Sequence, residues 1–235
     1  MVLADGVLTP AQSVLGAVQG IEVVSPNITK NVIVGSTDAI LALLFVVQPL
    51  GITRITVLFA PILMIWLLLN AAFGVFNLIQ HDATVFAAFN PAFAFAYLSR
   101  HGTGGWRSLG GVMLCFTGVE ALFADLGAFS ARAVRLSWLT FALPCIMLAY
   151  VGQAAYISDV PSGYCNPFFN AAPPGTLYPA LVIAILAAIV ASQAIITASF
   201  QLLAQVMKLS YFPQLKVVHT SESFHGQLYV PMANW

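Results

Sequence analysis

Long stretches without a charged residue limit how this chain can fold more than any other feature. Charges are absent from residues 55–80, 136–158 and 160–207. A helix crosses a bilayer with about 20 apolar residues, and each of these stretches is longer than that. Only 7% of the 235 residues are charged, against about a quarter in an ordinary soluble domain. The sequence therefore predicts an integral membrane protein with at least three spans.

Six apolar segments predict an all-α architecture with about six transmembrane helices. Their runs are continuous, whereas the strands of a membrane barrel alternate polar and apolar residues. We expect the transmembrane domain to cover residues 1–209. Residues 210–235 are more polar, and we expect a cytoplasmic loop there that leads to a further helix outside this chain. The expected spans are approximately 2–20, 32–50, 55–79, 108–127, 134–157 and 178–207.

The distribution of Lys and Arg over the connections predicts the orientation, because cytoplasmic loops are enriched in these residues. One side receives five of them and the other side three. This bias places the C-terminal segment in the cytoplasm and the 80–107 and 158–177 connections outside. The sequon Asn27-Ile-Thr29 falls on the outer side, so Asn27 is a candidate for glycosylation. The five residues are Arg54, Arg132, Arg135, Lys208 and Lys216, and the three are Lys30, Arg100 and Arg107.

The first expected span, "ADGVLTPAQS", carries an acid among apolar residues. Asp5, Thr9 and Ser13 follow one another at i, i+4 and i+8, which places their oxygens on one face of a helix. Pro10 has no N–H, so the carbonyl of Gly6 loses its usual donor and is open to another partner. Such a face suits a cation. The alternative is that Asp5, so near Met1, simply lies at the membrane interface.

A second acid, Glu120, lies in the expected fourth span, three residues after Thr117. Gly118 between them makes local unwinding inexpensive, and unwound helices in transporters expose backbone carbonyls near the midplane. Hydroxyl, carboxylate and carbonyl oxygens can replace the hydration shell of an alkali cation. The alternative for Glu120 is a structural hydrogen bond to another helix.

Other classes of function find no support in the sequence. The formal net charge is zero, which gives no indication of a nucleic-acid partner. Neither a nucleophile paired with a base, nor a phosphate-binding glycine loop, nor a His/Cys metal set is apparent, so we expect no enzyme, no cofactor and no metal beyond a transported ion. Asn70 and Gln193, inside expected spans, are interpreted as interhelical hydrogen-bonding residues.

Five segments together resemble a known family. They are "DGVLTPAQSVL", "FTGVEALFADLGAFS", "LAYVGQAAY", "AAIVASQAIITASF" and "FPQLKVVHTS". In order and spacing they resemble successive motifs of the KUP/HAK/KT potassium transporters, most closely the fungal and plant branch. The six spans are similar to the third to eighth helices of that family, so the resemblance implies an interior fragment of a longer protein.

The resemblance implies an inverted-repeat, LeuT-like fold of the amino acid–polyamine–organocation superfamily and uptake of potassium by symport with protons. It implies that Asp5 and Thr9, with Ser13, contribute to the potassium site from the third helix. Thr117 would be a ligand on a broken sixth helix, and Glu120 would be the acid linked to proton coupling. The implied partners are the lipid bilayer, the potassium ion and the proton, and the implied location is the plasma membrane. A homodimer is compatible with the sequence.

Two alternatives remain open at the level of the sequence. The chain can be a non-transporting membrane protein that assembles with a longer relative or acts as a sensor. It can also belong to a transporter of the same fold for another substrate, although Asp5 with Glu120 suits a cation better than a zwitterion.

Overall fold

The computed structural model of this chain describes residues 2–25, 27–48, 53–81, 83–114, 131–219 and 228–234. These residues are almost entirely helical, as the apolar runs predict. The longer helices are α1 (Val2–Val24), α2 (Lys30–Val47), α3 (Thr53–Gln80), α4 (Pro91–Leu114), α7 (Leu143–Asp159) and α9 (Leu177–Lys208). The shorter elements are the 3-10 helices η2 (Ala83–Phe89) and η4 (Pro161–Cys165), α6 (Ala131–Ser137), the π-helical turn η3 (Trp138–Ala142), α8 (Pro167–Asn170), α10 (Pro231–Asn234) and the strands β1 (Val218–His219) and β2 (Leu228–Tyr229).

Four helical stretches of the described chain are long and apolar enough to cross a membrane. They are Lys30–Val47, Leu58–Gln80, Ala131–Asp159 and Leu177–Lys208, the third being α6, η3 and α7 in succession. Their outer faces expose large aliphatic side chains, as helices in contact with lipid do. The prediction of a helical integral membrane protein is thereby confirmed, whereas the count of six spans stays a prediction.

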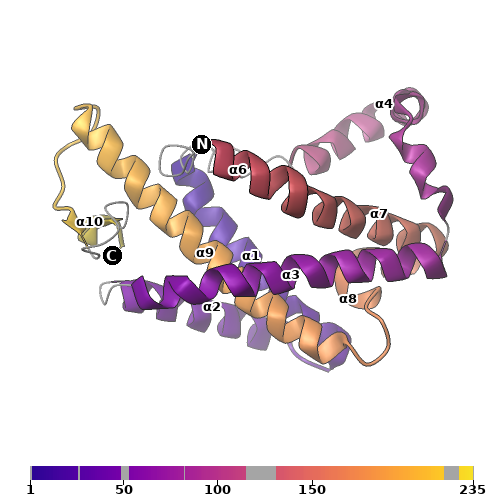
Figure 1. Ribbon diagram of the computed structural model, residues 1–235, viewed down its shortest axis with the longest axis horizontal. Coiled ribbons are helices and arrows are strands. Elements are labelled where there is room, and N and C mark those ends of the chain that lie inside the picture. Colours follow the sequence, from indigo (N-terminus) through magenta and orange to yellow (C-terminus); the bar gives the residue numbers. More distant parts are fainter. Residues whose placement is uncertain are drawn as a thin grey trace.

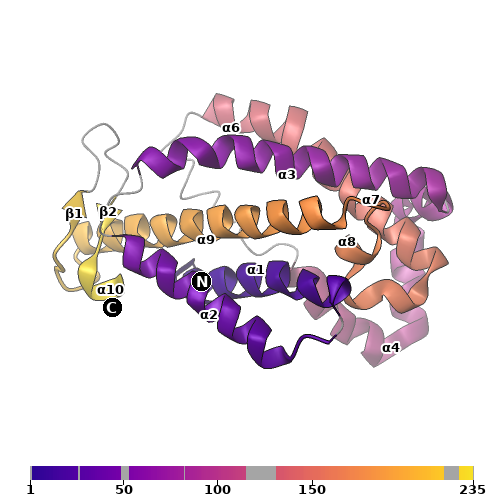
Figure 2. The same cartoon turned by 90° about the horizontal axis from the view of Figure 1, so that it is seen from below.

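Helix α9 is the central helix of the molecule. Figure 2 shows α9 with α3 on one side and α1 on the other, and the most extensive helix contacts are those of α1 with α9 and of α3 with α7. Helix α2 packs on α1 and touches α9. Segments from the two ends of the chain, α1 and α9, are therefore direct neighbours.

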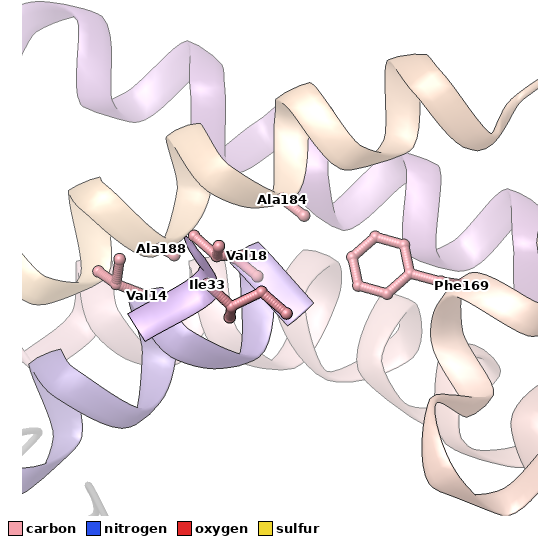
Figure 3. Packing of buried hydrophobic residues seen from close by; sticks show 7 residues of the cluster. Val14, Val18, Ile33, Phe169, Ala184 and Ala188 are labelled. Atoms are coloured by element: carbon pink, nitrogen blue, oxygen red, sulfur yellow. The ribbon is translucent and has the colours of Figure 1, made fainter. Parts of the chain in front are cut away.

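The core between α1 and α9 is built from small and branched side chains. Val14 and Val18 of α1 are fully buried against the alanines of α9 that Figure 3 labels. Ile33 of α2 closes the same cluster, and Phe169 of α8 covers its far end. Alanine lets two helices approach closely, which in lipid strengthens van der Waals packing. This packing fixes the face of α1 that meets α9.

The contact between α3 and α7 depends on two glycines. A Cβ at Gly74 would overlap the backbone carbonyl of Leu148, and a Cβ at Gly152 would overlap the backbone of Gly74. The two helix backbones are therefore in direct contact at this crossing.

The connection expected at residues 80–107 is not a loop. It consists of η2 and most of α4, which begins at Pro91, well before the expected fourth span. Asn90 Oδ1 accepts a hydrogen bond from the Ala92 N–H at 3.0 Å, and proline fits the first position of a helix. Gly102, with φ of 49° and ψ of −119°, interrupts α4. Figure 1 shows that α4 extends away from the other helices.

The segment after α9, expected to be a loop, also contains secondary structure. Strands β1 and β2 pair antiparallel, with Val218 opposite Tyr229. Tyr229 and Val230 are buried against the end of α9. Asn234 Nδ2 donates to the carbonyl of Phe45 at 3.3 Å, which connects α10 to α2.

Candidate functional site

The first predicted cluster of oxygen-bearing residues lies on α1. This helix is continuous from Val2 to Val24, so Asp5, Thr9 and Ser13 follow one another at intervals of one turn. The side chains of Thr9 and Ser13 are half-buried, and Thr9 takes part in an interaction within the fold. The side chain of Asp5 lies outside the described residues. The helical spacing is thus present, and the position of the carboxylate stays a prediction.

Pro10 lies at the crossing of α1 and α9. The hydroxyl of Ser192 on α9 is 2.7 Å from the carbonyl of Ala188 in its own helix and 3.3 Å from the carbonyl of Pro10. Ser192 is completely buried. Buried hydroxyls are stable only when they are hydrogen-bonded, and Ser192 meets that condition while linking the two helices.

Helices α1 and α9 also meet at Gly6, one turn before Pro10. A Cβ at Gly6 would overlap the Oγ of Ser199, so the Ser199 side chain packs directly against the backbone of Gly6. The Oγ of Ser199 is buried, and it has no hydrogen-bond partner in the described part of the chain. The interface between the two helices therefore contains one buried hydroxyl, that of Ser199, without a hydrogen-bond partner among the described residues.

A pair of buried amides connects α9 to the end of α2. Gln48 Nε2 donates to Gln193 Oε1 at 2.7 Å, and Gln193 Nε2 donates to Gln48 Oε1 at 3.1 Å. Both residues are at most 5% exposed. Thr197 Oγ1 donates to the carbonyl of Gln193 at 2.9 Å. The expected interhelical role of Gln193 is confirmed.

For Asn70, the hydrogen bond that the structure shows lies within its own helix, and the interhelical role stays a prediction. Asn70 Nδ2 donates to the carbonyl of Trp66 in its own helix at 2.7 Å. Asn77, which the sequence did not single out, makes the long-range bond instead: its Nδ2 is 2.8 Å from the Phe73 carbonyl and 3.0 Å from the Ala171 carbonyl. Asn77 is buried, and it ties α3 to the residues that follow α8.

A hydrogen bond between His81 and Asp159 joins the ends of α3 and α7. His81 Nδ1 and Asp159 Oδ2 are 2.7 Å apart, and the His81 ring packs edge-on against Tyr156. Both partners lie at the edge of the apolar stretches, where water can reach them. This contact is separate from the polar groups of α1 and α9.

The second predicted cluster, Thr117 and Glu120, lies outside the described residues. Its relation to α1 stays a prediction. Asn27 is exposed in the turn between α1 and α2, so its side chain is accessible. Across the residues that the structure describes, no group of three or more His, Cys, Asp or Glu side chains comes together in a way that could hold a metal ion.

Sequence reasoning missed two hydroxyls, those of Ser192 and Ser199. The segment "VASQAIITASF" contains both, seven residues apart in a helix that is mostly apolar. Residues seven apart lie on the same face of a helix. That spacing is the signal that predicts a shared polar position, although it does not say which helix lies opposite.

Comparison with known proteins supplies the biological context. The family model described as "K+ potassium transporter integral membrane domain" matches residues 1–235. Potassium transporter 5 of Oryza sativa subsp. japonica is 46% identical over 235 residues, and Potassium transporter 10 of Arabidopsis thaliana is 47% identical over 235 residues. Each alignment covers 100% of this chain and 30% of the relative. No solved structure matches the chain.

Proposed function

Because this chain belongs to the potassium transporter family whose integral membrane domain it matches along its whole length, we propose that it functions in the transport of potassium ions across a membrane. The match over residues 1–235 is the observation that carries the proposal. Relatives named as potassium transporters share 41–47% of its residues, and they are transport proteins rather than enzymes. The chain spans about 30% of the length of the curated relatives it matches, so the activity is proposed for the protein of which these helices are part.

The polar groups of α1 support a cation as the transported species. Thr9 and Ser13 are half-buried residues of α1, and α1 packs against α9, a helix of 32 residues. Hydroxyl and carbonyl oxygens replace the hydration shell of an alkali cation. In this proposal Asp5, Thr9, Ser13 and Thr117 hold the ion, together with carbonyls such as that of Gly6.

Coupling to protons is the second part of the proposal. Glu120 is the acid that takes up and releases a proton during the cycle, since a carboxylate at membrane depth is stable only beside a cation or when protonated. The proposed architecture is the inverted-repeat fold named above, and the proposed location is the plasma membrane.

A non-transporting membrane protein that assembles with a longer relative is the other candidate function. A transporter of another substrate is less well supported, because the matched relatives carry the name potassium transporter.

Growth of cells that lack potassium uptake separates these candidates. The coding sequence that contains this chain, with its natural flanking codons, should restore growth at low potassium, and Asp5→Asn in it should abolish the rescue. The 235-residue chain alone should not restore growth, because it spans only about 30% of the length of the relatives named as potassium transporters. If the flanked product reaches the membrane and does not support growth, the transport proposal fails and the partner function is favoured.

A further inference from the structure

We propose that Ser199 of α9 is a further oxygen ligand for the transported cation, placed opposite the backbone of Gly6 on α1. This inference rests on the proposed function and extends the ion site from α1 to a second helix. It assigns a role to a residue that neither the spacing on α1 nor the match to the family identifies.

The hydroxyl of Ser199 behaves unlike the other hydroxyls of α9. Serine and threonine inside helices usually donate to the carbonyl four residues earlier. Ser192 does so at 2.7 Å from the Ala188 carbonyl, and Thr197 does so at 2.9 Å from the Gln193 carbonyl. The Oγ of Ser199 is buried and unpaired within the described chain. An unpaired buried hydroxyl is unfavourable, so its presence indicates a partner such as an ion or a water.

The hydroxyl of Ser199 lies beside α1. Its Oγ is packed against Gly6, where a Cβ of residue 6 would be. The carbonyl of Gly6 receives no hydrogen bond from residue 10, because Pro10 has no N–H. Figure 2 shows α1 and α9 running side by side over this region, and the contact between them is one of the two most extensive in the molecule.

The same position is continuous with the predicted ion site. Thr9 follows Gly6 by three residues and Ser13 follows Thr9 by four, so these residues are neighbours along one side of α1. With about 100° of rotation per residue, Gly6, Thr9 and Ser13 fall within about 60° of one another on the helix. Hydroxyls from two helices and a carbonyl without its usual donor are the ligand set that a weakly held alkali cation requires.

The chemistry favours a cation over a structural contact. A hydroxyl that stabilised the helix pair directly would donate to a protein acceptor, as Ser192 does. Removing an unpaired buried hydroxyl leaves no new unsatisfied group, so Ser199→Ala should fold at least as well as the natural protein. This makes the variant a clean probe of ion binding.

The test uses the product of the whole coding sequence, with Ser199→Ala as the probe and Thr197→Val as the matched control on the same helix. Rubidium uptake and the thermal stability of the purified protein are measured in potassium, sodium and choline salts. In choline, the melting temperature of Ser199→Ala should equal or exceed that of the natural protein. Potassium should raise the melting temperature of the natural protein and of Thr197→Val, and it should raise that of Ser199→Ala much less.

In uptake, Ser199→Ala should raise the KM for rubidium by about tenfold or more, the size expected when a bond to a charged partner is lost. Its maximal rate should change little. An unchanged KM and an unchanged potassium effect would overturn the inference and leave the transport function standing. If the natural protein neither takes up rubidium nor is stabilised by potassium, the proposed function fails and this inference fails with it.

Discussion

The buried polar side chains of this protein connect helices that are distant in the sequence. Ser192 reaches the carbonyl of Pro10, Gln193 pairs with Gln48, and Asn77 reaches the carbonyl of Ala171. A polar group in an apolar interior is stable only with a partner, so each of these bonds restricts which helices can be neighbours. The polar residues therefore help to specify the arrangement of the helices as well as their contacts.

The Gln48–Gln193 pair allows a direct test of this point. Gln193→Leu leaves the buried amide of Gln48 without its partner and should lower the free energy of unfolding by about 1–3 kcal/mol. The double variant Gln48→Leu/Gln193→Leu should recover part of that loss, because no amide remains unsatisfied. The measurement is unfolding in detergent with a double-mutant cycle. Equal losses in the double variant and in the sum of the single variants would show that the amides do not act as a pair.

The contact between His81 and Asp159 should contribute far less to the free energy of unfolding. The two side chains are 19% and 58% exposed, and ion pairs open to water contribute about 0–1 kcal/mol. Asp159→Asn should therefore change the free energy of unfolding by less than about 1 kcal/mol. A loss comparable with that of Gln193→Leu, measured in the same detergent, would contradict this expectation.

At the residue scale, the sequence predicts positions along one helix better than contacts between two. Asp5, Thr9 and Ser13 are predictable because the helical repeat alone aligns them. Ser199 was not, because its relevance depends on α9 lying against Gly6, which no local pattern encodes. Asn70 and Asn77 show the same limit. Both are amides of one apolar helix, and only the tertiary packing determines that Asn77 bonds to the carbonyl of Ala171 outside that helix.

At the scale of elements, the charge-free stretches predict helices that the structure contains. α3 ends at Gln80, one residue before His81, and α9 ends at Lys208, where the charge-free stretch ends. The start of α4 was missed because Arg100, His101 and Arg107 make its middle part polar, which conceals the Asn90-Pro91 signal for a helix start. A helix that lies apart from the bundle need not carry a purely apolar sequence.

The crossing of α3 and α7 yields a prediction at this scale. Gly74→Ala places a Cβ against the backbone of Leu148. A backbone group, unlike a side chain, cannot rotate away from the added atom. Overpacking of this kind costs about 1–3 kcal/mol. The matched control is Gly35→Ala in α2, where nothing lies within 4 Å of the added Cβ. That change should leave stability unchanged or raise it by up to about 1 kcal/mol. Equal destabilisation by the two variants would show that the α3–α7 contact is looser than described.

At the scale of the whole molecule, the chain belongs to the potassium transporter family. It matches the membrane domain of the potassium transporters along its full length, while its relatives are about three times as long. Helix α9 contacts both α1 and α3, and α1 carries Thr9 and Ser13, the half-buried hydroxyl residues of the proposed ion site. In the proposed transporter, α1 and α9 are the helices that meet the ion.

Rubidium flux into liposomes is the direct test of cation transport by this protein. The purified product of the whole coding sequence is reconstituted, and uptake is driven by an inside-negative potential in the presence of competing ions. We expect uptake that potassium inhibits and sodium does not, that persists in Asp159→Asn, and that is lost in Glu120→Gln. Absence of flux from correctly reconstituted protein, or full flux in Glu120→Gln, would contradict that expectation.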